Sequence, residues 1–341
     1  MRVLKRLLCL GLISAVVLSS LGCGAGKESS GTGKKRLLIA HSHNAKHPVN
    51  LGLEAFKSEM EQETDYSFSI YPNGQLGGNA EMIQMVRGGV LDIAKVSASS
   101  LEQFNQSYAI FSLPYVFKSQ EHYFKTMENS QAVQEIFRST YDQGFVAIGW
   151  YDSGQRSIYT TGKGPVEKPA DLNGLKIRTQ DSPTSVEMIR NMGGSATPMS
   201  SGEVYSALQQ GIINGAENNE TVLSDDGHGE VAKSYTYTEH QYTPDIVIMS
   251  TKTLERMSKE DQDKIYQAMK DSWQVHEDAW KKIVERNKQE ASQKGVQFYQ
   301  IDKTPFINAC LPQQEAFRKS SENNARYLDD FLSYAEGGTG K

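Results

Sequence analysis

The chain has 341 residues, of which 38% are hydrophobic and 23% charged, as in ordinary soluble globular proteins. Its 36 Lys and Arg residues against 41 Asp and Glu residues give a net charge of −5, which does not indicate a nucleic-acid-binding protein. This length predicts about two domains, each able to bury a core of its own.

The chain begins with a pattern that is typical of a secretory signal peptide. Basic residues near the start precede an apolar run over residues 7–18, and small residues follow. The sequence SLGC, which ends at Cys23, resembles a lipoprotein cleavage box in which the cysteine becomes the lipidated first residue. We therefore expect residues 1–22 to be removed and residues 23–35, rich in Gly and Ser, to form a flexible tether. The alternative is full cleavage to a freely soluble secreted protein.

Cysteine usage agrees with this leader. Cys9 would leave with the signal peptide and Cys23 would carry lipid, so Cys310 would stand alone and form no intrachain disulfide. We expect Cys310 to be a small buried hydrophobic residue rather than a nucleophile.

From residue 36 onward, strand-like and helix-like patterns alternate. The first half predicts a strand at 36–41, a helix at 49–64, a strand at 66–72, a helix at 79–90, a strand at 91–98, an apolar segment at 109–117, helical residues from about 122 to 142 and a strand at 145–154. The second half predicts strands at 156–161 and 175–178, helices at 185–193 and 202–211, strands at 213–219 and 245–251, a long helix over about 259–294, a strand at 296–301 and a helix near 313–334. This alternation implies α/β lobes with mostly parallel sheets.

Polar residues at strand ends are candidates for ligand contacts, because ligands of such sheets bind beyond the carboxyl ends of the strands. These candidates are His41, Ser97, Arg156, Arg178, Asn218 and Asn219. Arg178 closes an apolar strand, and its planar guanidinium can hold a carboxylate through two parallel hydrogen bonds, which a lysine cannot do. The alternative for an arginine in such a place is a structural ion pair, for Arg156 with Asp152 or with a carboxylate of the other lobe.

The common catalytic motifs are missing from the sequence. His41, His43 and His47 are closely spaced, but no cysteine partner or H-E-x-x-H helix accompanies them, so we do not expect a metal site. No G-x-S-x-G turn, P-loop or dinucleotide fingerprint occurs. We therefore expect no cofactor and no catalysis. Two arginines suit the holding of an anion better than the protonation of a leaving group.

Seven motifs occur in order between residue 36 and about residue 325, and their order is specific although each motif alone is weak. They are YPNGQLG, FSLPYVF, DSGQRS, DLNGLKIR, GGSATPMS, EVYSALQQGIINGAENN and SYTYTEHQY. In these motifs the chain resembles the extracytoplasmic solute-binding proteins of tripartite ATP-independent periplasmic (TRAP) transporters. The segments AHSHNAKHPV, AKVSA and ENN are most similar to the hexuronate-binding branch, although Asn214 stands where many members have an aspartate.

This resemblance implies a fold of the periplasmic-binding-protein type, with two α/β lobes, a hinge and a long helix that crosses both lobes. Lobe I would comprise residues 36–153 and 244–283. Lobe II would comprise residues 154–243 and 284–332.

The resemblance also implies roles for individual residues. Arg178 would clamp the ligand carboxylate, Asn218 would be its companion, and Arg156 would support the anion. Glu81 would accept hydrogen bonds from sugar hydroxyls. Apart from the resemblance, His240 in TEHQY could either approach the cleft or bridge the hinge. The full set of expected ligand-binding residues is Arg178, Arg156, Asn218, His41, Glu81, Ser97, His240 and Asn219.

The function implied by the resemblance is capture of a small sugar acid, a hexuronate such as glucuronate or galacturonate, and its delivery to membrane permease subunits. We expect a monomer outside the cytoplasm, either lipid-anchored through Cys23 or periplasmic, with no nucleic-acid partner. The alternatives are a sensing module for a signalling receptor, a binder of another organic acid such as a C4-dicarboxylate or a sialate-like acid, and an enzyme acting on uronates.

Overall fold

The structure is a computed structural model that describes residues 34–162 and 164–335. The predicted signal peptide, Cys23 and most of the predicted tether lie outside these residues. Within the two described ranges, no helix is both long enough and apolar enough to cross a membrane.

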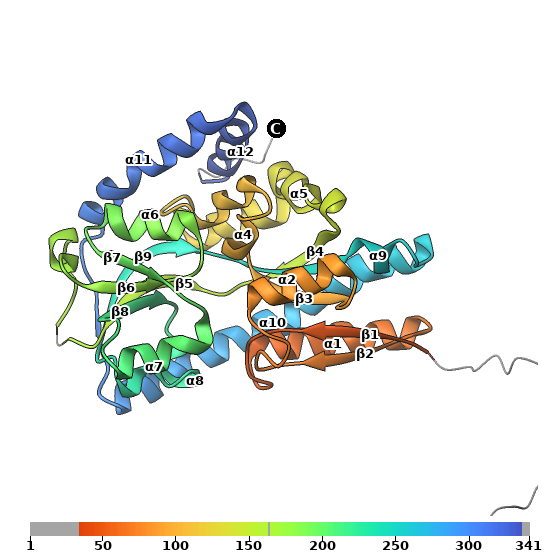
Figure 1. Cartoon of the computed structure of the whole chain (residues 1–341), viewed down its shortest axis with the longest axis horizontal. Coiled ribbons are helices and arrows are strands. Elements are labelled where there is room, and N and C mark those ends of the chain that lie inside the picture. The colour runs from red at the N-terminus through yellow and green to blue at the C-terminus, as the bar shows by residue number, and fades with distance from the viewer. Residues whose placement is uncertain (1–33, 163, 336–341) are drawn as a thin grey trace, which may run out of the picture. The chain divides into compact units, whose positions relative to one another are not determined.

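The first lobe is built on a five-stranded sheet, sheet A, with the strand order β2-β1-β3-β10-β4 (Figure 1). Its strands are β1 (Lys35–Ala40), β2 (Tyr66–Tyr71), β3 (Ile93–Ser97), β4 (Phe145–Tyr151) and β10 (Asp245–Ser250). Every residue of β3 and β10 is buried, because apolar clusters cover both faces of the sheet. Its helices are α1 (Pro48–Glu63), α2 (Asn79–Gly88), α3 (Ala98–Leu101), α4 (Gln120–Asn129), α5 (Gln131–Arg138) and α9 (Thr251–Leu254), with 3₁₀ turns at Gln106–Ser112 and Tyr141–Gln143.

Helix α1 shows how the local sequence fixes an element of this lobe. Pro48 occupies its first turn, and the ring of His47 caps it by accepting a hydrogen bond from the backbone N–H of Val49. Its apolar face, which includes Leu53 and Phe56, is fully buried against sheet A, as its periodicity predicts.

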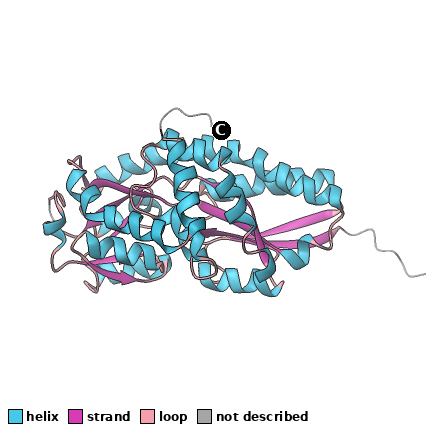
Figure 2. Ribbon diagram, turned by 90° about the horizontal axis from the view of Figure 1, so that it is seen from above, coloured by secondary structure: helices cyan, strands magenta, loops and turns pink. Residues whose placement is uncertain are grey.

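The second lobe is built on a six-stranded sheet, sheet B, with the strand order β11-β9-β5-β8-β6-β7. Its strands are β5 (Gln155–Thr160), β6 (Lys176–Thr179), β7 (Ser195–Pro198), β8 (Gly215–Asn218), β9 (Ser234–Tyr242) and β11 (Gln297–Tyr299). Its shorter helices are α6 (Pro183–Asn191), α7 (Val204–Gln209) and α8 (Val222–Asp225), with 3₁₀ turns at Pro169–Leu172, Ser201–Glu203 and His228–Glu230. Helices flank the strands of both sheets (Figure 2). β7 and β9 were not predicted from the sequence.

Two neighbouring crossings carry the chain between the lobes. β4 leads through residues 152–154 into β5, and β9 returns through residues 243–244 into β10. Tyr151 pairs with Asp245 on one side of the crossings, and Gln155 pairs with Tyr242 on the other. As a result β10 and β5 run antiparallel to both of their neighbours, so the expectation of parallel pairing is confirmed for the other pairs and wrong for these two strands.

The long helix α10 (Lys259–Gln293) reaches from the side of α1 to the side of α8 (Figure 1). Its 35 residues span about 50 Å at the standard helical rise. Ile265 and Met269 belong to the core of the first lobe, and Ala291 belongs to the core of the second. The predicted long helix that crosses both lobes is therefore confirmed.

The chain ends in two helices, α11 (Thr304–Ser320) and α12 (Glu322–Ser333), where one was predicted. Ser321 separates them with extended backbone and caps α12 by accepting from the backbone N–H of Asn324. Cys310 of α11 is fully buried in a cluster of the second lobe, as predicted. Phe331 of α12 is instead buried in the first lobe, so the prediction that residues up to 332 belong to lobe II is wrong for this helix.

Candidate functional site

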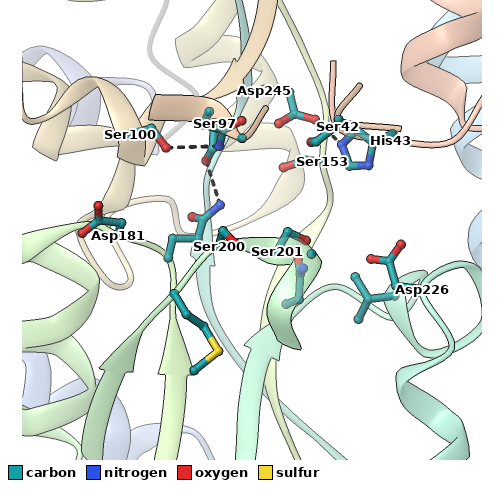
Figure 3. Close-up of a pocket in the computed structure, with 18 of the residues that line it drawn as sticks. Ser42, His43, Ser97, Ser100, Ser153, Asp181, Ser200, Ser201, Asp226 and Asp245 are labelled. Carbon is teal, nitrogen blue, oxygen red and sulfur yellow. Dashed lines mark hydrogen bonds and ion pairs between the residues drawn. The ribbon is translucent and has the colours of Figure 1, made fainter. Parts of the chain in front are cut away.

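A cavity of about 910 Å³ lies between the two lobes and is lined by side chains from both. From the first lobe come Glu81 and Ser97, and from the second come Arg156, Arg178, Asn218 and Asn219, all of them predicted site residues. His41 and His240 were predicted as well, but they are not among the residues that line it. Figure 3 shows the two walls of the cavity facing each other, with Ser97 and Asp245 on one wall and Ser200 and Asp226 on the other.

Arg178 lies in β6, directly beside β8, and is only 4% exposed. Its Nε and Nη2 both donate to the carbonyl oxygen of Met199, at 3.1 and 2.8 Å. That carbonyl occupies the Nε–Nη2 edge of the guanidinium. The Nη1–Nη2 edge is left for a second acceptor, and this edge fits a carboxylate with two parallel hydrogen bonds.

Arg156 is held by a carboxylate of its own sheet. Its Nε lies 2.5 Å from Oε2 of Glu217, and its Nη2 donates to Oε1 of the same side chain at 2.9 Å. Burial alone would raise the pKa of Glu217, but the charge of Arg156 and the contact with His240 lower it to about 2. Arg156 therefore forms an ion pair, but with Glu217 rather than, as expected from the sequence, with Asp152 or a carboxylate of the other lobe.

Asn218 follows Glu217 and is oriented by the same arginine. Its Oδ1 accepts from Nη1 of Arg156 at 2.7 Å and from the backbone N–H of Asn219 at 2.9 Å. With Oδ1 fixed in this way, the Nδ2 amide is the group that Asn218 can offer to a ligand as a donor.

Asn219 shapes the turn after β8. Its Nδ2 donates to the carbonyl of Ser153 at 2.8 Å, and its Oδ1 accepts from both the backbone and the hydroxyl of Thr221. The side chain thus ties the end of β8 to the crossing segment 152–154.

Gln180 bridges the two walls of the cavity. Its Nε2 donates to Oγ of Ser97 at 3.0 Å, and its Oε1 accepts from Oγ of Ser99 at 2.8 Å. The two serine hydroxyls also lie 2.9 Å apart, which closes a ring of three hydrogen bonds, two of them between the lobes. Gln180 lies two residues beyond Arg178 and was not predicted as a site residue, because its partners are about eighty residues away in the chain.

Glu81 lies on α2 and is exposed to the cavity. One of its oxygens, Oε2, accepts from the backbone N–H of Gly78 at 2.9 Å and so caps the helix. The same carboxylate can still accept from a ligand hydroxyl, because an ionised carboxylate has several lone pairs.

A cluster of three side chains from the first lobe, Lys95, Asp245 and His43, also lines the cavity. The ammonium of Lys95 lies 3.1 Å from Oδ1 of Asp245, and Nε2 of His43 lies 3.5 Å from Oδ2 of the same residue. His43 also stacks on His47 at 3.8 Å between ring centroids. Burial would raise the pKa of Asp245, but Lys95 and His43 keep it well below its usual range. Asp245 starts an apolar strand, and this position was the one sequence signal that could have identified it.

His41 and His240 lie behind the cavity wall. His41 is fully buried, with Nε2 3.0 Å from Oδ1 of Asn50, and burial lowers its pKa to about 3. His240 is also fully buried, between Thr238 and Glu217, and burial lowers its pKa. His240 therefore stands behind Arg156, through Glu217, rather than in the cavity.

The arrangement as a whole suits reversible capture of an anion. Arg178, Asn218 and Arg156 come from three adjacent strands, β6, β8 and β5, and meet at one edge of sheet B. Donors dominate this edge, whereas serines and carboxylates line the rest of the cavity.

Comparisons with known proteins identify the relatives of this chain. The family model described as bacterial extracellular solute-binding protein, family 7, matches residues 39–320. The protein YiiZ of Salmonella typhimurium is 42% identical to the chain over 283 residues, which cover 82% of this chain and 86% of that protein.

Solved structures extend the comparison to bound ligands. A TRAP periplasmic solute-binding protein from Anaerococcus prevotii with bound α/β-D-glucuronate has a TM-score of 0.87 and 42% identity, and the match covers 89% of this chain and 99% of that one. A TRAP periplasmic solute-binding protein from Sulfitobacter sp. NAS-14.1 with bound β-D-galacturonate has a TM-score of 0.83 and 30% identity, with 87% of this chain and 99% of that one covered.

Proposed function

Because the chain belongs to family 7 of the bacterial extracellular solute-binding proteins, we propose that it is a receptor that captures a hexuronate and delivers it to a TRAP permease. The resemblance to TRAP solute-binding proteins that the sequence motifs indicate is confirmed by the family match and by the solved structures. The hexuronates in question are glucuronate and galacturonate, which similar solved proteins hold.

The observation that carries this proposal is the pair formed by Arg178 and Asn218. The Met199 carbonyl occupies one edge of the Arg178 guanidinium, and the other edge is left for a carboxylate. Arg156 fixes the Asn218 amide so that its Nδ2 can donate to the same anion. The cavity volume of about 910 Å³ lies within the range of roughly 300–1,000 Å³ that is typical of small-molecule sites.

The hydroxyl groups of a sugar acid would meet acceptors and small donors on the rest of the wall. Ser97 and Glu81 face the cavity from the first lobe, and Ser200 and Asp226 face it from the second. A ligand that contacts both walls stabilises the closed arrangement of the lobes and shifts their population toward it. The paired crossings at residues 152–154 and 243–244 are the natural hinge for this motion.

The chain acts as a binder and not as an enzyme in this proposal. The residues at the carboxylate end are donors held in place by other protein groups, which suits tight and reversible binding. We also propose that the mature protein is a monomer that Cys23 anchors to the membrane outside the cytoplasm, since the leader ends in a lipoprotein-like SLGC sequence.

A thermal-shift screen tests the ligand class directly. Glucuronate or galacturonate at 100 times its dissociation constant should stabilise the fold by roughly 2.7 kcal/mol, and the neutral parent sugars should not. Equal shifts with glucose and glucuronate would rule out the carboxylate clamp. A shift with succinate-like diacids alone would keep the clamp and exclude hexuronates as ligands.

A further inference from the structure

Within the described residues, the cavity wall carries more acidic than basic side chains, and only some of the basic ones have an ion-pair partner. Among the described residues that line it are three basic side chains, Lys95, Arg156 and Arg178, and five acidic ones, Glu81, Asp181, Asp225, Asp226 and Asp245. Two of the cations are already neutralised, since Lys95 pairs with Asp245 at 3.1 Å and Arg156 with Glu217 at 2.5 Å. No carboxylate in the described part of the chain forms an ion pair with Arg178, whose guanidinium is bound to a backbone carbonyl instead.

The neutralised lysine lies on the wall opposite Arg178. Lys95 and Asp245 belong to β3 and β10 of sheet A, whereas Arg178 belongs to β6 of sheet B. Asp245 contacts two groups at once, the ammonium of Lys95 and the ring of His43. Figure 3 shows Asp226 on the second-lobe wall, below the side of the cavity that carries His43 and Asp245.

This distribution allows one anionic group in the ligand and disfavours a second. A carboxylate at Arg178 meets a cation that lacks a counter-charge, so its desolvation is compensated. A second carboxylate on the same ligand would meet cations that already have partners and additional acidic side chains, and like charges in contact are costly. The position of this second carboxylate along the wall does not change the outcome, because the other two basic side chains, Lys95 and Arg156, are both paired.

We propose that Asp245 is a specificity-determining residue that masks Lys95 and His43, so that the site accepts sugar monocarboxylates and rejects aldaric and other dicarboxylic acids. This inference rests on the proposed function, because it assigns the ligand class within the same cavity. In this proposal the acidic wall repels a second carboxylate and the masked cation does not attract it, which separates uronates from C4-dicarboxylates and aldarates. Specificity often depends on such a repulsive element.

The test compares two acids that differ at one end, D-glucuronate and D-glucarate, by calorimetric titration of the mature chain. The wild type should bind glucuronate more tightly. Asp245→Asn keeps the shape of the side chain and removes the charge, which unmasks Lys95. The ratio of the glucarate affinity to the glucuronate affinity should then rise by roughly tenfold or more.

The double variant Lys95→Met/Asp245→Asn is the matched control, since it removes the pair without a change in net charge. It should show no gain for glucarate. Asp226→Asn is a second probe, because Asp226 is exposed to the cavity and a change there leaves the buried pair intact. It should raise the ratio in the same direction as Asp245→Asn. Melting curves without ligand show whether each variant is folded.

The outcomes separate this inference from the proposed function. A wild type that binds glucarate as tightly as glucuronate overturns the inference and leaves the carboxylate clamp in place. A folded Asp245→Asn that gains nothing for glucarate also overturns it, and if that variant does not fold, an unchanged ratio in Asp226→Asn does so. A wild type that binds neither glucuronate nor galacturonate overturns the proposed function, and the inference fails with it.

Discussion

Gln180 and Ser97 join the two lobes directly, with Nε2 of Gln180 donating to Oγ of Ser97 at 3.0 Å. A second bond, from the hydroxyl of Ser99 to Oε1 of Gln180 at 2.8 Å, uses the other end of the same amide. Gln180 lies two residues beyond Arg178, so the strand that holds the proposed carboxylate site is also fastened to the opposite lobe. We therefore expect ligand binding and lobe closure to be coupled through a few residues of one strand end.

Replacement of this bridge should weaken ligand binding. Gln180→Leu removes two hydrogen bonds, each worth about 0.5–1.5 kcal/mol, so the dissociation constant for glucuronate should rise roughly fivefold to a hundredfold. Gln103→Ala is the control, because Gln103 also contacts the opposite lobe, at Asp181, but is exposed. Titration calorimetry should show a smaller effect for the control. Equal effects would mean that the buried bridge has no special part in closure.

Arg178→Lys keeps the charge and removes the planar edge. One charge-assisted hydrogen bond is worth about 1.5–3 kcal/mol, so hexuronate affinity should fall roughly tenfold to a hundredfold or more. The variant also disturbs the two bonds to the Met199 carbonyl, so a small loss of ligand-free stability is expected as well. Arg326→Lys, at an exposed position of α12 where the arginine pairs with Glu135 away from the cavity, is the matched control. Near-normal affinity in Arg178→Lys would show that the guanidinium edge is not the recognition element.

The buried pair of Arg156 and Glu217 should make the fold sensitive to acid. The folded pKa of Glu217 is about 2, below the usual 4.5 of a glutamate, so its contribution to stability is present above the usual value. That contribution should be lost as the pH falls from about 4.5 toward 2. Glu217→Gln should lower the free energy of unfolding at neutral pH by about 3–5 kcal/mol, because a buried cation loses its partner. Urea unfolding at several pH values measures both effects, and Glu285→Gln on the exposed face of α10 is the control. A Glu217→Gln variant as stable as the wild type would contradict this account.

Asp152, in the crossing between the lobes, should change the pH dependence of stability in the opposite direction to Glu217. Burial raises its pKa to about 7, and nearby carboxylates add to this effect against a hydrogen bond from Gly154. A raised folded pKa means that stability is present below the ordinary value of 3.8 and is lost as the pH rises toward about 7. Asp152→Asn should therefore gain stability relative to the wild type between about pH 4 and 7, on the order of a few kcal/mol. A constant stability difference across that range, in unfolding curves at each pH, would show that Asp152 does not titrate there.

Cys23 lies outside the described residues, and its lipidation is tested in cells. The protein should fractionate with membranes, and Cys23→Ser should release it or block its processing, because the lipid would be attached to the thiol. Cys310→Ser is the control, since Cys310 is buried in the second lobe. A wild-type protein that is entirely soluble, with an unmodified N-terminus, would refute the anchor.

The sequence by itself determined most of the helices and strands, and it identified Arg178 and Asn218 as residues at strand ends. Apolar alternation and helical periodicity depend on neighbours a few residues apart, so most strands and the long helix α10 were predicted correctly. Arg178 and Asn218 could be placed at strand ends for the same reason. The order of the sequence motifs also indicated the correct family. β9 was overlooked although its alternating tyrosines and polar residues are a local strand signal.

The tertiary structure decided which strand-end residues meet in the cavity. Gln180 meets Ser97 and Asp245 meets Lys95 across long stretches of chain, and no local pattern records such pairs. In the same way, packing buries His41 and His240 behind the cavity wall, and it places α12 against the first lobe rather than the second. A local pattern shows that a side chain lies at the end of a strand. Only the packing of the two lobes determines whether that side chain faces a ligand, an ion-pair partner or the core, because burial and charge pairing depend on residues distant in sequence.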